Sequence, residues 1–107
     1  MILESDASSF AESPTNLAVV HAGDYLNKLS GERIERECRQ KLGEGCSELI
    51  LNFSRTEIVN SVGISILLGV IDAAATTGAK IVFANVKPDT VELFDLLGLT
   101  RHVTIAT

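Results

Sequence analysis

The sequence has few cysteines and few histidines, which limits the chemistry it can support. The two cysteines, Cys38 and Cys46, are too few and too far apart for a tetrahedral zinc site. We expect them to be small buried hydrophobic residues or semi-exposed thiols in a reducing compartment. The two histidines, His21 and His102, lie far apart in the chain, and neither is expected to bind a metal or act in catalysis. No metal and no cofactor are therefore predicted.

The sequence also lacks a basic cluster and a long apolar run. The net charge is −5, and the densest basic segment, residues 33–41, is interleaved with Glu35 and Glu37. This argues against binding of nucleic acid through its phosphates. No apolar run reaches the roughly 20 residues that a bilayer requires, and residues 1–6 do not resemble a signal peptide. We expect a cytoplasmic protein with no nucleic-acid partner and no membrane partner.

The common catalytic and phosphate-binding motifs are missing too. Gly63 and Gly69 have the wrong spacing for a dinucleotide-binding loop or for a P-loop with its lysine. Ser61 has no histidine near it in the sequence, and Ile64 stands where a Ser-x-x-Lys motif would need lysine. No pair of carboxylates stands out as an acid–base site. The sequence therefore predicts a protein that is not an enzyme.

The most informative stretch that is present runs from residue 60 to residue 72. It joins a strand-like run, residues 48–53, to a predicted helix over residues 61–77. Asn60 and Ser61 are both residue types that cap helix N-termini. Ser61 is therefore either part of an ordinary capped helix or an exposed hydroxyl placed for modification or recognition. The apolar residues that predict one buried helical face are at positions 64, 67, 68, 71, 74 and 75.

The other face of this helix carries mostly small residues. Such a face is consistent with plain solvent exposure and also with a docking surface that a partner can approach closely. Composition leaves both interpretations open. The residues of this face are Ser61, Ser65, Gly69, Asp72 and Thr76.

Strand and helix patterns alternate along the rest of the chain. Ser30 is the expected N-cap of the first helix, and residues 25–29 are expected to form a connection. Strands are predicted over residues 8–12, 17–22, 49–53, 80–85 and 102–106. Helices are predicted over residues 31–42 and 61–77 and from Pro88 to Gly98, the last with an apolar face of Val91, Phe94, Leu97 and Leu99.

This order predicts an α/β fold with a mixed, mostly parallel sheet of about four to five strands and helices packed on it. The run 49–53 is expected to be a central strand covered on both faces. One domain is expected over residues 1–107, with residues 1–16 as an edge strand or a flexible segment. Functional groups in such sheets gather beyond the carboxyl ends of strands. Ser61 lies in such a position, as do residues 24–29 and 86–89.

Several segments in the right order resemble the STAS domain, the fold of bacterial anti-sigma factor antagonists. The resemblance covers residues 17–106. Its main part is a strand, a turn and a serine followed by x-Gly and a helix, over residues 49–69. Gly23 and Asp24 after the second strand, residues 78–86, Pro88 and residues 93–99 also fit.

In the partner-switching members of this family, a serine just before x-Gly is phosphorylated by a kinase that is also the anti-sigma factor. The resemblance implies that Ser61 is the phosphoacceptor. It also implies that the unphosphorylated protein binds this kinase and that the phosphorylated protein releases it. It further implies a partner-facing neighbourhood around Ser61. That neighbourhood consists of Asp24, Asn27, Asn60, Val62, Gly63, Ser65 and Gly69. A monomer or a weak dimer is expected.

The sequence departs from the family pattern at two positions. Asn60 replaces the aspartate that usually precedes the serine, and Asn27 fills the place of an acid near the end of the second strand. If those acids orient the hydroxyl or engage the kinase, phosphorylation is expected to be slow or to use a different kinase. A constitutive scaffold or transport-complex module is therefore the alternative. A weaker third hypothesis is nucleotide binding at the free N–H groups of the helix start.

Overall fold

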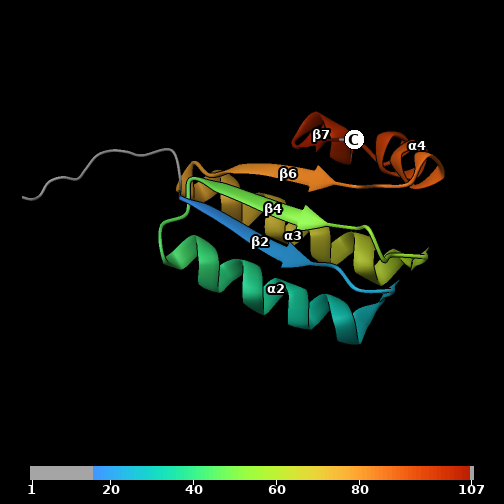
Figure 1. The fold of residues 1–107 in the computed structure, drawn as a ribbon, viewed down its shortest axis with the longest axis horizontal. Coiled ribbons are helices and arrows are strands. Elements are labelled where there is room, and N and C mark those ends of the chain that lie inside the picture. Colours follow the sequence, from blue (N-terminus) through green and yellow to red (C-terminus); the bar gives the residue numbers. More distant parts are fainter. Residues whose placement is uncertain (1–15, 107) are drawn as a thin grey trace, which may run out of the picture.

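A computed structural model of the chain describes residues 16–106. Four strands form one sheet, in which β4 and β6 lie between β2 and β7 (Figure 1). Every neighbouring pair in this sheet is parallel, which confirms the α/β fold class. The strands are β2 (Leu17–His21), β4 (Glu48–Asn52), β6 (Lys80–Ala84) and β7 (Thr104–Ala106).

Parallel neighbours must be joined by long crossovers, and helices supply them here. A second, two-stranded parallel ladder of β3 (Tyr25–Leu26) and β5 (Ile58–Val59) precedes two of these helices. The helices are α2 (Lys28–Gly43), α3 (Ser61–Thr77) and α4 (Pro88–Leu96), and a 3₁₀ turn, η2 (Leu99–Arg101), follows α4.

The core lies between the sheet and the helices. Strand residues alternate between buried and more exposed positions, so one face of β2 and β4 supplies the core. The buried residues Ile34, Cys38 and Leu42 follow each other at four-residue steps along α2 and belong to the same cluster. On the opposite face of β2, Leu17 and Val19 remain about half exposed.

β4 is the central strand that the sequence predicts, and its two faces are covered to different extents. Leu49 and Leu51 are fully buried, whereas Ile50 on the opposite face is only half-buried. The apolar run of this strand therefore overstates its burial. Buried and half-buried residues alternate along β4, as in a strand with one fully packed face.

Three phenylalanines pack the C-terminal part of the fold against the sheet. Phe53 follows β4, Phe83 lies in β6 and Phe94 lies in α4. Their rings pack edge to face, with centroids 5.0–5.7 Å apart. Such pairs add stability beyond the burial of their area, so α4 is part of the main core.

The prediction for the start of α2 is wrong. Ser30 is not the N-cap, and residues 25–29 are not a plain connection: they contain β3 and the first turn of the helix. The cap is Asn27, whose Oδ1 accepts a hydrogen bond from Ser30 N–H at 3.0 Å. The Ser30 hydroxyl in turn accepts from Asn27 N–H at 3.0 Å, which completes a capping box.

The bounds predicted for α3 are confirmed, but its buried face is shifted. Leu68 is 40% exposed and Ala75 is exposed, whereas Val70 is fully buried. The reason is that α3 packs against both the sheet and α2, so its buried arc differs from a single stripe. Gly78 ends the helix with a φ of +80°, the left-handed conformation that glycine favours at this position.

The C-terminal region differs from its prediction in two details. Leu97 is half exposed and follows α4, so it does not belong to the packed face that Phe94 and Leu99 provide. The last strand, β7, begins at Thr104, because residues 99–101 first form the 3₁₀ turn. The strand predicted over residues 8–12 lies outside the described residues.

Candidate functional site

The small ladder of β3 and β5 places two helix N-termini next to each other. Leu26 lies opposite Val59 in this parallel pair, and Asn60 N–H donates to the Leu26 carbonyl at 3.0 Å. The next residue after each strand, Asn27 or Asn60, caps a helix. The chain enters α2 from β3 and enters α3 from β5. Because these two strands are paired, the two helix starts lie at the same edge of the molecule.

Asn60 is the cap of α3, and Ser61 is the first helical residue after it. Asn60 Oδ1 accepts from Gly63 N–H at 2.9 Å, and the Asn60 carbonyl accepts from Ile64 N–H at 3.1 Å. The Ser61 side chain is exposed, and its hydroxyl makes no hydrogen bond within residues 16–106. The cap therefore does not use the serine, and its hydroxyl faces solvent at a helix start.

The two glycines of the predicted neighbourhood lie on the packed side of α3. Gly63 is buried, and a Cβ added there would lie 2.6 Å from the Leu26 carbonyl oxygen and 2.7 Å from Leu26 Cγ. Only glycine allows α3 to approach β3 this closely. Gly69 is half-buried near α2, where an added Cβ would lie 3.7 Å from Glu35 Oε2.

Val62 and Ser65 lie on the accessible side of the same helix. Val62 is 43% exposed although it is apolar, and Ser65 is exposed. The Ser65 hydroxyl donates to the Ser61 carbonyl at 3.2 Å, one turn back along the helix. Of the small face predicted for α3, the first two turns are thus open around Ser61, whereas Gly69 lies beside α2.

Asp24, in the loop after β2, and Asn27, directly after β3, are built into the framework in different ways. Asn27 is half-buried, and its side chain is engaged in the capping box of α2. Asp24 has an exposed side chain, but its carbonyl accepts from Glu57 N–H at 2.8 Å and from Ile58 N–H at 3.3 Å. The Asp24 backbone therefore fixes the loop, and its carboxylate is available to a ligand or partner.

Exposed apolar side chains gather at this edge, and the sequence prediction missed three of them. Tyr25 and Ile58 lie opposite each other in the small ladder, and Leu29 is in the first turn of α2. They are 42%, 54% and 79% exposed, respectively. Each of them lies two residues from a capping asparagine, a spacing that does not by itself indicate that they meet. Together with Val62 they form what we call the apolar rim of Ser61.

The remaining chemistry of the described residues is sparse. Within residues 16–106, no group of three or more metal-ligating side chains comes together. Cys38 and Cys46 are buried free thiols, as predicted. Burial raises the pKa of Cys38 to about 12, with Glu37 adding to the shift, so this thiol is protonated and unreactive at neutral pH. None of the helices over residues 16–106 is both long and apolar enough to span a membrane.

A parallel α/β sheet with a serine exposed at a capped helix start defines the kind of domain. The family model of the STAS domain matches residues 10–107, so the chain belongs to the STAS family. No curated protein matches the sequence closely enough to count as a relative.

Solved structures of the same fold come from different kinds of protein. The tm1081 protein of Thermotoga maritima, a proposed anti-sigma factor antagonist, has a TM-score of 0.77 at 15% identity, over 87% of this chain and 80% of its own. The anti-sigma factor antagonist SpoIIAA in its unphosphorylated form gives 0.70 at 22%, over 90% and 85%. The STAS domain of a SulP transporter from Vibrio cholerae gives 0.74 at 19%, over 89% and 76%. At these identities, the likeness shows the fold and not which function applies.

Proposed function

We propose that this domain is a non-enzymatic, cytoplasmic regulator that acts as an anti-sigma factor antagonist, binds a serine kinase that is also the anti-sigma factor, and is switched by phosphorylation of Ser61. One observation carries the proposal. The Ser61 hydroxyl is exposed at a helix start where the neighbouring Asn60 already performs the capping. A kinase can therefore modify the serine without removing a structural hydrogen bond. SpoIIAA, which has the same fold, has also been solved in a phosphorylated form.

A phosphate on Ser61 would weaken the binding of a partner without unfolding the domain. It adds about −1.5 to −2 charges at neutral pH. The partial positive charge of the helix N-terminus tolerates such a group, so the fold is retained. A partner that packs on the apolar rim of Ser61 would have to desolvate that charge next to Tyr25, Ile58 and Val62. We expect binding to weaken by about 1–3 kcal/mol or more.

The test is binding of the purified domain to its kinase partner by calorimetry. We expect Ser61→Ala to bind as the wild type does, and Ser61→Asp to bind at least tenfold more weakly. Thr76→Asp is a matched control, because it adds the same charge to an exposed position near the other end of α3. Equal affinity of wild type and Ser61→Asp would sink the proposal. Mass spectrometry of the protein from its native cell would then show whether Ser61 carries phosphate.

A second candidate function is a constitutive interaction module of a scaffold or a transport complex. It is favoured by the asparagines at positions 27 and 60, which cap helices but place no carboxylate near Ser61. The STAS domain of a SulP transporter has the same fold. On this alternative, the partner binds equally well to wild type and Ser61→Asp, and no phosphate is found on the native protein.

A further inference from the structure

Among residues 16–106, helices cover only one face of the main sheet. α2 and α3 pack on the face that supplies the core, and no helix lies in front of β2 and β4 in Figure 1. Side chains alternate between the two faces along each strand, so every second strand residue points away from α2 and α3. We call this side the open face of the sheet. The residues of it that matter here are Leu17, Val19, Glu48, Ile50, Lys80 and Val82.

The open face is apolar at its centre. Leu17 and Val19 are 51% and 50% exposed, and Ile50 is half-buried. Val82 lies between Ile50 and Thr104 in the sheet and is buried, but it does not belong to the core cluster on the helix side. Sheets in which all strands are parallel occur almost only with both faces covered. An apolar open face on such a sheet therefore indicates that something packs on it.

The two charged residues of the open face are opposite in sign and lie in one row. Glu48 of β4 pairs in register with Lys80 of β6, and in the next row of the same face Ile50 pairs with Val82. Neither Glu48 nor Lys80 takes part in an ion pair within residues 16–106. This face carries one acid and one base, so its charge selects neither an anionic membrane nor a nucleic acid.

We infer that the open face is covered by the open face of a second copy of this chain, in a dimer with two-fold symmetry. A two-fold axis that runs along the strands, between β4 and β6, places β4 of one copy over β6 of the other. Glu48 then lies over the partner's Lys80, and Ile50 lies over the partner's Val82. Because each pair is in register within the chain, both contacts form at once, and each forms twice.

The spacing of packed sheets suits these contacts. Facing sheets lie about 10 Å apart, a gap that a glutamate and a lysine side chain can bridge from opposite sides. Their strands cross at about 30°, so rows near the axis stay superimposed. β4 and β6 are the two inner strands of the sheet and lie next to this axis. The open face is therefore complementary to itself in both charge and apolar contact.

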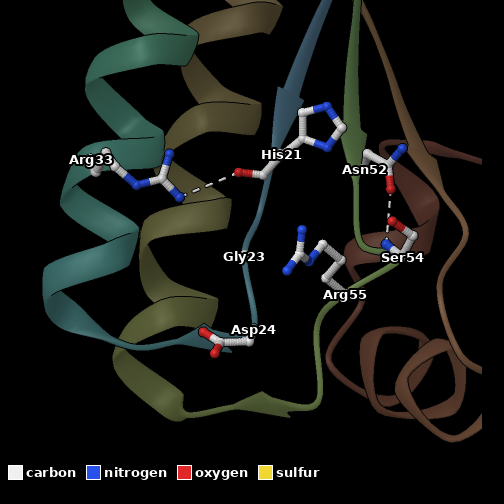
Figure 2. A pocket seen from close by; sticks show the side chains of 7 residues that line it. All are labelled: His21, Gly23, Asp24, Arg33, Asn52, Ser54 and Arg55. Carbon is white, nitrogen blue, oxygen red and sulfur yellow. Dashed lines mark hydrogen bonds between the residues drawn. The ribbon is translucent and has the colours of Figure 1, made fainter.

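The size of the open face predicts a weak dimer. β2, β4 and β6 have five residues each, so the face is about 17 Å long and, over four strands, about 19 Å wide. This area of roughly 300 Å² per copy is well below the ~800 Å² per partner of a standard stable interface. The face also becomes polar at one end, where His21 lies opposite Asn52 (Figure 2). We expect a Kd on the order of 0.1 mM.

The test is sedimentation equilibrium of the full chain from about 10 µM to about 1 mM, on both sides of the expected Kd. The wild type should be a monomer at the low end and mostly a dimer at the high end. Glu48→Lys and Lys80→Glu should each weaken association about tenfold or more, because like charges then face each other. Glu92→Lys is the matched control, since it reverses the same charge at an exposed position of α4.

An equimolar mixture of Glu48→Lys and Lys80→Glu separates the dimer from effects within one chain. In the mixed dimer, the two lysines of one copy lie over the two glutamates of the other, so the attraction returns. We expect the mixture to associate about as strongly as the wild type. Neither misfolding of a variant nor the loss of a contact between Glu48 and Lys80 of one chain can produce this result.

A wild type that stays monomeric at about 1 mM would overturn the inference. That outcome would mean that residues 1–15 or a different protein covers the open face. Dimers that withstand both charge reversals would overturn it too, as would a mixture that fails to associate. Ser61 begins α3, which packs on the other face of the sheet. The dimer therefore leaves Ser61 accessible, and phosphorylation of Ser61 tests the proposed function separately.

Discussion

Gly63 and Gly69 lie six residues apart on α3, but their surroundings differ. A methyl group at Gly63 would collide with the Leu26 backbone, whereas at Gly69 it would make an ordinary contact. We expect Gly63→Ala to lower the free energy of unfolding by about 1–3 kcal/mol. Gly69→Ala should raise it by up to about 1 kcal/mol, since alanine favours the helix. Urea denaturation of both variants measures the difference, and equal effects would contradict the packing described for Gly63.

Cys38 makes the stability of the fold depend on pH in the alkaline range. The ordinary thiol pKa of 9.0 applies to the unfolded chain, and burial raises it to about 12 in the folded protein. Above pH 9 the unfolded chain therefore loses the thiol proton first, which favours unfolding. We expect this group to reduce the free energy of unfolding by up to about 1.4 kcal/mol per pH unit between pH 9 and 12.

Comparison with Cys38→Ala isolates this contribution from the lysines and the tyrosine. The variant should be less stable at neutral pH, because it leaves a cavity. Its stability should nevertheless decline less steeply between pH 9 and 12 than that of the wild type. Parallel stability curves over this range would show that Cys38 is not desolvated in the folded state.

At the scale of the element, α3 depends on a single side-chain cap. Asn60 Oδ1 satisfies the N–H of Gly63, and no acidic residue lies in the first turn. We expect Asn60→Ala to cost about 1 kcal/mol of stability, and Asn60→Asp to cost little because aspartate caps equally well. Thermal denaturation of the two variants provides the measurement. If both lose the same stability, the cap contributes nothing beyond the residue's other contacts.

Asn60→Asp also restores the acid that the family pattern usually has before the serine. If that carboxylate engages the kinase, we expect faster phosphorylation of Ser61 in this variant, with a stability close to that of the wild type. A kinase assay with purified protein provides the measurement. An unchanged rate would mean that the acid is not what sets the rate of phosphorylation in this domain.

Long elements were predictable from the sequence, whereas short ones were not. The bounds of α3 follow from its cap, its apolar spacing and Gly78. The strand β3 has only two residues, too few for any periodicity. Without β3, the sequence predicts that α2 begins at Gly31, because Ser30 before a glycine resembles an N-cap. The helix in fact begins at Lys28. The structure places Ser30 inside the capping box instead.

The surroundings of Ser61 were predictable only in part, for a similar reason. Ser61 and Val62 are found from their own segment, which has a clear helix signal. Tyr25 and Leu29 reach the same edge only because β3 pairs with β5. A pocket at the carboxyl ends of β2 and β4 likewise brings together Arg33 of α2 and Arg55 of the loop after β4 (Figure 2), which lie far apart in the sequence. Contacts between segments that are far apart in the chain leave no local pattern in the sequence.

At the scale of the whole molecule, we expect residues 16–106 to unfold as one cooperative unit. The Phe53, Phe83 and Phe94 rings connect the sheet to α4, so the C-terminal part has no core of its own. The chain has one tyrosine and no tryptophan. Tyr25 fluorescence reports on the Ser61 edge, and far-ultraviolet circular dichroism reports on all helices. The two urea transitions should coincide, and separate midpoints would indicate independent units.

The parallel sheet has a consequence for how fast the chain reaches this state. Leu17 pairs with Glu48, and Glu48 pairs with Lys80, so no described ladder of the main sheet can form by a local turn. Each pair of strands can form only after the connection that contains the crossover helix has crossed the sheet. The conformational entropy of this long connection is lost before the strand contacts stabilise the structure. Slow folding leaves the apolar strands 49–51 and 81–83 open to other chains during synthesis. We therefore expect the demand for protection by chaperones to rise with the time that these strands spend unpaired.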